Sequence, residues 1–73
     1  MSNLNRTAKL AYFTARKRDG DVKKISEEVG SRTDYVRRML NGERKINYDV
    51  ADYAYHMTRN RKRNSEIGYY AEY

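Results

Sequence analysis

The sequence predicts a compact all-α domain of four to five helices, and two observations lead to this prediction. Gly20, Gly30 and Gly42 divide most of the chain into pieces of helical length, and glycine is the usual residue just past a helix end. Within each piece, apolar residues recur three and four positions apart, which is the period of an amphipathic helix. The first sixty residues contain no convincing strand pattern, although residues 69–73 could pair as a strand. With 73 residues the chain forms one domain at most, near the lower limit for a self-sufficient core.

The first predicted helix runs from about Asn5 to Arg18. Asn5 can cap it, because its side-chain oxygen can accept a hydrogen bond from a free N–H group of the first turn. The basic residues 16–18 suit the negative end of the helix dipole, and Asp19-Gly20 then predicts a turn. The expected inward stripe consists of Leu4, Ala8, Ala11, Tyr12 and Ala15.

The second predicted helix runs from about Asp21, a good N-cap residue, to Val29, and Gly30 ends it. Its inward face is expected to consist of Val22, Ile25, Ser26 and Val29. Its outward face carries charges of both signs, at Lys23, Lys24, Glu27 and Glu28.

The third predicted helix runs from about Arg32 to Asn41 and is closed by Gly42. Its apolar edge is expected to consist of Val36, Met39 and Leu40, which Tyr35 can join. The residues left to face outward are Arg32, Thr33, Asp34, Arg37, Arg38 and Asn41.

The fourth predicted helix runs from about Asn47, its cap, to Arg61, and Ile46 lies just before the cap. Its inward stripe is expected to consist of Val50, Tyr53, Ala54 and Met57. Beyond Arg59 the sequence is basic and then tyrosine-rich, and it extends the fourth helix, forms a short fifth one, or frays. The chain is therefore divided into a domain over residues 1–58 and an extension over residues 59–73.

The charge of the chain favours a polyanionic partner. Sixteen Lys and Arg residues face ten Asp and Glu residues, which gives a net charge of +6. A small basic protein attracts nucleic acid, acidic membranes or acidic proteins, and charge alone does not choose among them.

Composition argues against several other classes. The chain has no cysteine, which removes disulfides and thiolate metal sites. Its apolar runs are too short to span a membrane, and residues 1–6 lack the apolar stretch of a signal peptide, so the cytoplasm is the expected compartment. The sequence contains no histidine pair and no glycine-rich phosphate loop, and His56 has no ligand partner. We therefore expect no enzyme, no metal, no cofactor and no small-molecule substrate.

The segment from Val22 to Gly42 meets the requirements for two short helices that cross at a steep angle. The crossing demands a small residue, which Ser26 supplies, and the turn needs a positive backbone angle, which Gly30 tolerates without steric cost. The second of the two helices has one apolar edge to bury and one polar edge left free.

This segment resembles the helix-turn-helix of the lambda-repressor and Cro-like family, also called XRE-like. The resemblance covers about residues 4–57, and it departs from the common pattern at Ser26, where alanine is more usual, and at Ser31, where many members have an apolar residue. The matching residues are Ile25, Ser26, Val29, Gly30, Val36, Met39, Leu40, Asn41 and Gly42.

The resemblance implies that the third helix enters the major groove of duplex DNA with its N-terminal end toward the bases. The implied base-contacting residues are Arg32, Thr33, Asp34, Arg37 and Arg38. The implied phosphate-contacting residues are Lys23, Lys24, Asn41, Arg44 and Lys45.

The expected function is sequence-specific binding of double-stranded DNA by a small transcriptional regulator, of the repressor type found in phages and mobile elements, acting as a homodimer. Two alternatives stay open: a DNA-packaging or architectural protein without sequence preference, and a virion or protein-interaction module that keeps the fold alone. At single positions, Asp34 either contacts a base or stabilises the helix dipole. The basic run 59–63 either follows phosphates or is solvated, and the tyrosines of residues 69–73 either form a dimer contact or are disordered.

Overall fold

The prediction of an all-α fold is confirmed. The computed structural model describes residues 5–69 and consists of helices and connecting loops over that range. The helices are α1 (Arg6–Thr14), α2 (Asp21–Val29), α3 (Thr33–Leu40), α4 (Tyr48–Thr58) and α5 (Asn64–Ile67). Of the alternatives for the end of the chain, the short fifth helix is the one observed. Tyr69 lies outside any helix or strand, and the rest of the predicted strand, 70–73, falls outside the described residues.

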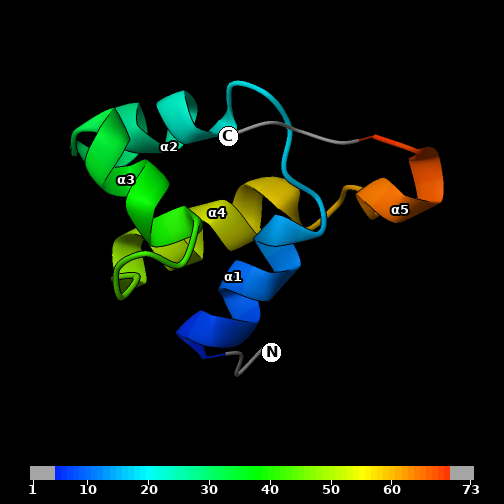
Figure 1. Ribbon diagram of the computed structural model, residues 1–73, viewed down its shortest axis with the longest axis horizontal. Helices are drawn as coiled ribbons and strands as arrows, with labels where there is room; N and C mark the ends of the chain where they lie inside the picture. The colour runs from blue at the N-terminus through cyan, green and yellow to red at the C-terminus, as the bar shows by residue number, and fades with distance from the viewer. Residues whose placement is uncertain (1–4, 70–73) are drawn as a thin grey trace.

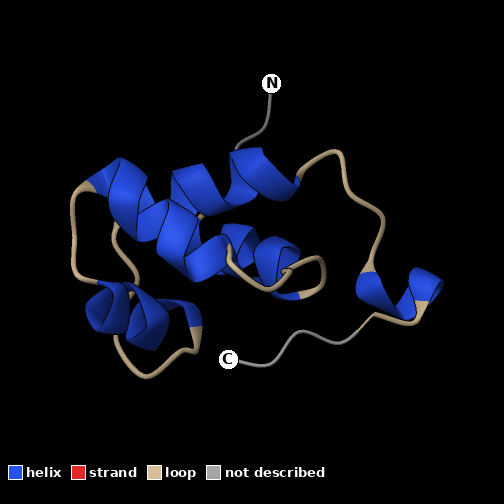
Figure 2. Ribbon diagram, turned by 90° about the horizontal axis from the view of Figure 1, so that it is seen from above, coloured by secondary structure: helices blue, strands red, loops and turns tan. Residues whose placement is uncertain are grey.

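Helices α1 to α4 pack around one core. The closest packing joins α1 to α4, α2 to α3 and α2 to α4 (Figure 1). Figure 2 shows α5 apart from the other helices, beyond the connection over residues 59–63 that follows α4. Helices α1 to α4 and the loop before α4 all contribute to the core, which consists of Phe13, Val22, Ile25, Val36, Met39, Leu40, Ile46, Val50, Ala51 and Ala54. None of the helices within residues 5–69 is long and apolar enough to cross a membrane.

The predicted inward stripe of α1 is wrong in its centre. Phe13, absent from that stripe, is fully buried, and Leu10 packs against the core one turn earlier. Ala11 is exposed, and Leu4 lies outside the described residues. The physical reason is size: burying a phenylalanine and a leucine removes far more apolar surface from water than burying alanines, so the bulky pair sets the rotation of the helix. The helix also ends at Thr14 rather than near Arg18, and residues 16–18 belong to the following loop.

The caps of the helices follow the prediction except at α2. Asn5 and Asn47 accept hydrogen bonds from the backbone N–H groups of Ala8 (2.8 Å) and Val50 (2.9 Å), as expected of N-caps. The predicted cap Asp21 is instead the first residue of α2, and Gly20 holds the cap position with a φ of 90°. The Asp21 carboxylate turns back to accept from the backbone N–H of Arg18 at 2.6 Å.

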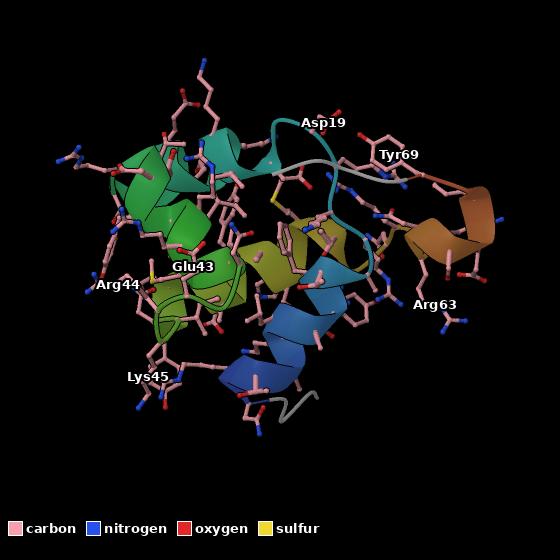
Figure 3. The ribbon with its side chains drawn as sticks, in the orientation of Figure 1. Asp19, Glu43, Arg44, Lys45, Arg63 and Tyr69 are labelled. Atoms are coloured by element: carbon pink, nitrogen blue, oxygen red, sulfur yellow. The ribbon has the colours of Figure 1, made fainter. Side chains whose placement is uncertain are left out.

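Residues 61–69, which we call the C-terminal strap, are tied to the loop between α1 and α2. The Asp21 carboxylate accepts two hydrogen bonds from the Arg61 guanidinium, at 2.7 and 3.1 Å. Asn64 donates from its backbone to the Ala15 carbonyl at 2.7 Å and from its side chain to the Lys17 carbonyl at 2.9 Å. The Tyr69 hydroxyl accepts from the backbone N–H of residue 19 at 3.1 Å (Figure 3). Helix α4 ends at Thr58 rather than near Arg61, and the extension predicted over residues 59–73 is bound to the rest of the domain through residues 61–69.

Candidate nucleic-acid interface

Helix α3 has one buried edge and one exposed edge. Val36 and Met39 are fully buried and Leu40 is 4% exposed, so the predicted apolar edge is confirmed. Successive residues of an α-helix are rotated by about 100°, and the side of α3 opposite the buried edge carries four exposed residues. These are Asp34, Arg37, Arg38 and Asn41.

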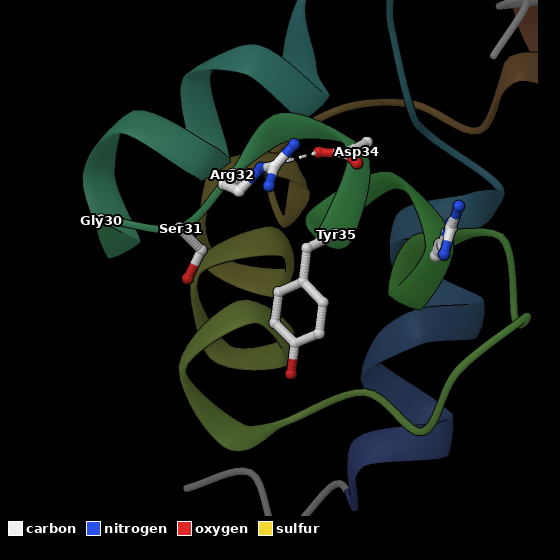
Figure 4. A pocket seen from close by; sticks show the side chains of 6 residues that line it. Gly30, Ser31, Arg32, Asp34 and Tyr35 are labelled. Atoms are coloured by element: carbon white, nitrogen blue, oxygen red, sulfur yellow. Dashed lines mark ion pairs between the residues drawn. The ribbon is translucent and has the colours of Figure 1, made fainter.

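Arg32 and Asp34 form an ion pair at the start of α3. Arg32 is the N-cap residue, with an extended ψ of 144°, and its side chain is 86% exposed. Its Nε lies 3.5 Å from Oδ1 of Asp34, whose side chain is 53% exposed (Figure 4). An ion pair this exposed contributes little to folding stability. It brings the Arg32 guanidinium next to Asp34 at the start of α3.

Thr33 is placed differently from the other predicted base-contacting residues. Its hydroxyl lies 3.1 Å from that of Ser26, which is 3% exposed at the crossing of α2 and α3. Ser26 donates its own proton to the Lys23 carbonyl at 2.7 Å, so Thr33 is the donor in the contact between the two hydroxyls. Thr33 therefore links α3 to α2 through its hydroxyl and is half-buried.

A hollow of about 410 Å³ opens beside the turn between α2 and α3, and we call it the α3 hollow (Figure 4). It is lined by Gly30, Ser31, Arg32, Asp34, Tyr35 and Arg38. Gly30 has the positive φ expected of this turn, at 72°. Tyr35 was expected to join the apolar edge, but it is 38% exposed and presents its ring to the hollow. In the sequence, only the position of Tyr35 one helical turn before Arg38 indicated that it lies beside the exposed edge.

The five predicted phosphate-contacting residues are all exposed. Lys23 and Lys24 lie on the outer face of α2. Asn41 caps the end of α3, and Arg44 and Lys45 lie on the loop before α4, far from Arg63 (Figure 3).

The loop that carries Arg44 and Lys45 is held against the end of α3. The Arg38 carbonyl accepts from the backbone N–H groups of Glu43 at 2.9 Å and Arg44 at 3.3 Å. The Arg44 guanidinium lies 5.0 Å from the ring centroid of Tyr35, within cation–π range. Arg44 is therefore joined to the α3 hollow through Tyr35.

The part of the chain that the structure describes contains no group of three or more His, Cys, Asp or Glu side chains that could hold a metal ion. The histidine of the chain, His56, is exposed on α4. Its ring lies 5.7 Å from that of Tyr55, edge to face.

No protein-family model, curated protein or solved structure matches the chain.

Proposed function

We propose that the chain is a sequence-specific double-stranded DNA-binding protein that inserts α3 into the major groove and regulates transcription, as small phage or mobile-element repressors do. The observation that carries this proposal is the exposed edge of α3. Arg37 and Arg38 are exposed on this edge, and the opposite edge of α3 is buried in the core. The resemblance of residues 22–42 to the lambda-repressor-like helix-turn-helix agrees with this geometry.

The chemistry of the exposed edge suits base edges. An arginine can donate two hydrogen bonds to the O6 and N7 acceptors of guanine, a pairing worth about 1–3 kcal/mol of discrimination. Asp34 can accept from the cytosine amine or orient a neighbouring guanidinium, and it forms an ion pair with Arg32. Thr33 is the weakest of the five base-contacting candidates, because its hydroxyl proton is engaged by Ser26.

Affinity in this proposal comes from phosphate contacts. Lys23, Lys24, Arg44 and Lys45 are exposed cations around α3, and each contact to a phosphate releases condensed counterions and makes binding weaken with salt. Such contacts set the position of the protein on the duplex and leave sequence choice to the bases. A homodimer on an inverted repeat doubles both kinds of contact. For such a repressor, the proposed compartment is the bacterial cytoplasm or nucleoid.

The test is selection from a random duplex library, followed by sequencing and by affinity measurements on the enriched duplex. We expect an enriched inverted repeat. The double variant R37A/R38A should lose about 2–6 kcal/mol of discrimination between the enriched and a scrambled duplex, from two contacts of about 1–3 kcal/mol each.

The matched control is R59A/K62A, which removes two exposed charges from the connection between α4 and α5. It should keep the sequence preference, whether or not its overall affinity falls. If R37A/R38A keeps the preference as well, the assignment of the base-contacting edge is wrong. Binding that collapses with salt and enriches no sequence would support the packaging alternative. An absence of binding at low salt would support the protein-interaction alternative.

A further inference from the structure

The beginning of α1 lies against the loop between α3 and α4. Arg6 donates from Nη1 to the Ile46 carbonyl at 3.0 Å, and its guanidinium lies 4.4 Å from the ring centroid of Tyr48. These two contacts hold the Arg6 head group in place on the loop. A cation held in advance loses little side-chain entropy when it binds a ligand.

A second hollow, of about 220 Å³, lies between α1 and this loop, and we call it the loop hollow. Arg6, Arg44 and Lys45 line it together with the hydroxyl-bearing Thr7, and no acidic residue is among its lining residues. Like charges around one small hollow repel each other, so a bound anion stabilises the arrangement. Gly42, also in the lining, has open space where a Cβ would stand, so a ligand can approach its backbone.

The size of the loop hollow limits the ligand. Pockets for whole small molecules measure about 300–1,000 Å³, so 220 Å³ suits a single anionic group with some water. Guanidinium and ammonium groups with a neighbouring hydroxyl are the donors that bind phosphate in proteins.

Arg44 connects the loop hollow to the α3 hollow. It lines the loop hollow, and its guanidinium also lies over the ring of Tyr35, which lines the α3 hollow. The two hollows are therefore neighbours on one surface. A duplex whose bases meet the exposed edge of α3 carries backbone phosphates on both sides of that contact, so a phosphate-binding site is expected on the surface beside that edge.

The geometry points to the loop hollow as a phosphate clamp, in which Arg6, Arg44 and Lys45 bind one phosphodiester group of the DNA backbone and Thr7 donates a further hydrogen bond. This inference rests on the proposed function and adds α1 to the DNA-binding surface. It also makes Arg6 a binding residue in addition to its contacts with Ile46 and Tyr48.

The test uses the full chain and a set of duplexes derived from the enriched one, each with a single neutral methylphosphonate in place of one phosphate. For the wild-type protein, substitution at one phosphate position should weaken binding by about tenfold, the factor expected for one charge-assisted hydrogen bond. In both Arg6→Ala and Lys45→Ala, the penalty at that same position should be smaller than in the wild-type protein, because each variant removes one of the contacts to that phosphate. Lys62→Ala, which removes an exposed cation from the strap, should keep the full penalty.

Circular dichroism spectra decide which variants are informative, since Arg6→Ala also removes contacts to the loop. If Arg6→Ala fails to fold, the test is decided by Lys45→Ala and by Arg6→Lys. The latter keeps the charge at residue 6. Arg6→Lys should keep part of the penalty. If the wild-type protein binds the unmodified duplex but no position loses its penalty in these variants, the clamp is refuted while the proposed function stands. If the wild-type protein binds no duplex, the proposed function and the clamp both fail.

Discussion

Replacement of Arg61 by alanine removes the partner of a buried carboxylate. The side chain of Asp21 is 6% exposed and that of Arg61 is 25% exposed. The guanidinium donates two hydrogen bonds to Asp21 and a third, at 3.2 Å, to the Arg16 carbonyl. Without it the Asp21 carboxylate keeps the backbone N–H of Arg18 as a donor, but its negative charge loses the guanidinium that faces it.

The expected loss of stability is a large share of the total. Removing one partner of a buried ion pair costs about 3–5 kcal/mol. Because Arg61 is a quarter exposed and Arg18 continues to donate to Asp21, we expect about 3 kcal/mol, at the low end of that range. At about 0.05–0.15 kcal/mol per residue, a chain of 73 residues has a stability of about 4–11 kcal/mol. Arg61→Ala therefore removes between about a quarter and three quarters of it.

Urea denaturation followed by circular dichroism measures this loss. With a denaturant slope of about 1–3 kcal/mol per molar, the midpoint should fall by about 1–3 M. The double variant Asp21→Asn/Arg61→Met removes both charges and should be more stable than Arg61→Ala, because it leaves no unpaired buried charge. The exposed neighbour Lys62, replaced by alanine, should change stability by no more than about 0.5 kcal/mol. A loss below about 0.5 kcal/mol in Arg61→Ala, or a double variant less stable than the single one, would refute this reasoning.

Three further predictions concern single positions. Phe13→Ala should cost about 3–5 kcal/mol in the same urea assay, because Phe13 is fully buried; an unchanged midpoint would contradict its place in the core. Gly30→Ala should cost about 1–2 kcal/mol, since φ is +72° and the surrounding space is open; Gly30→Asn should cost less, and equal losses would argue against a backbone origin. The hydrogen bond from the Arg63 backbone N–H lowers the pKa of Glu66 below its usual 4.5. The ionised Glu66 carboxylate therefore stabilises α5 fully above pH 4.5, and this stabilisation is lost as pH falls through the lowered pKa. The Arg63 amide NMR signal should therefore titrate below pH 4.5 and lose this titration in Glu66→Gln; a midpoint at or above 4.5 would contradict the hydrogen bond.

The fold was predictable where apolar residues were large and regularly spaced. Val22 and Ile25 defined the buried face of α2, and its bounds agree with the prediction. In α1 the alanines offered a regular but weak stripe, and periodicity alone did not reveal that Phe13 sets the rotation of the helix. The spacing of apolar residues shows which positions share a helix face. It does not show which face buries the larger apolar area, and that area decides which face packs against the core.

The exposed positions of the candidate interface were predictable from the same period, but the partners of its side chains were not. Arg37 and Arg38 are exposed, as the helical spacing predicted. The hydrogen bond between Thr33 and Ser26 depends on how two helices cross, and the contact of Arg44 with Tyr35 depends on the path of a loop. Such contacts join residues through tertiary structure, and no local pattern in the sequence indicates them.

The C-terminal strap has a consequence for the order in which the domain is completed. Asp21 and Arg61 are 40 residues apart in the chain, and residues 19 and 69 are 50 apart. During synthesis the buried carboxylate of Asp21 therefore meets the Arg61 guanidinium only after the 40 residues that follow Asp21 have left the ribosome. We expect the loop between α1 and α2 to become protected from proteases in a nascent chain only after the strap has bound it. Chains released from the ribosome and ending at residue 58 or at residue 69 should differ most in protease protection at the loop between α1 and α2.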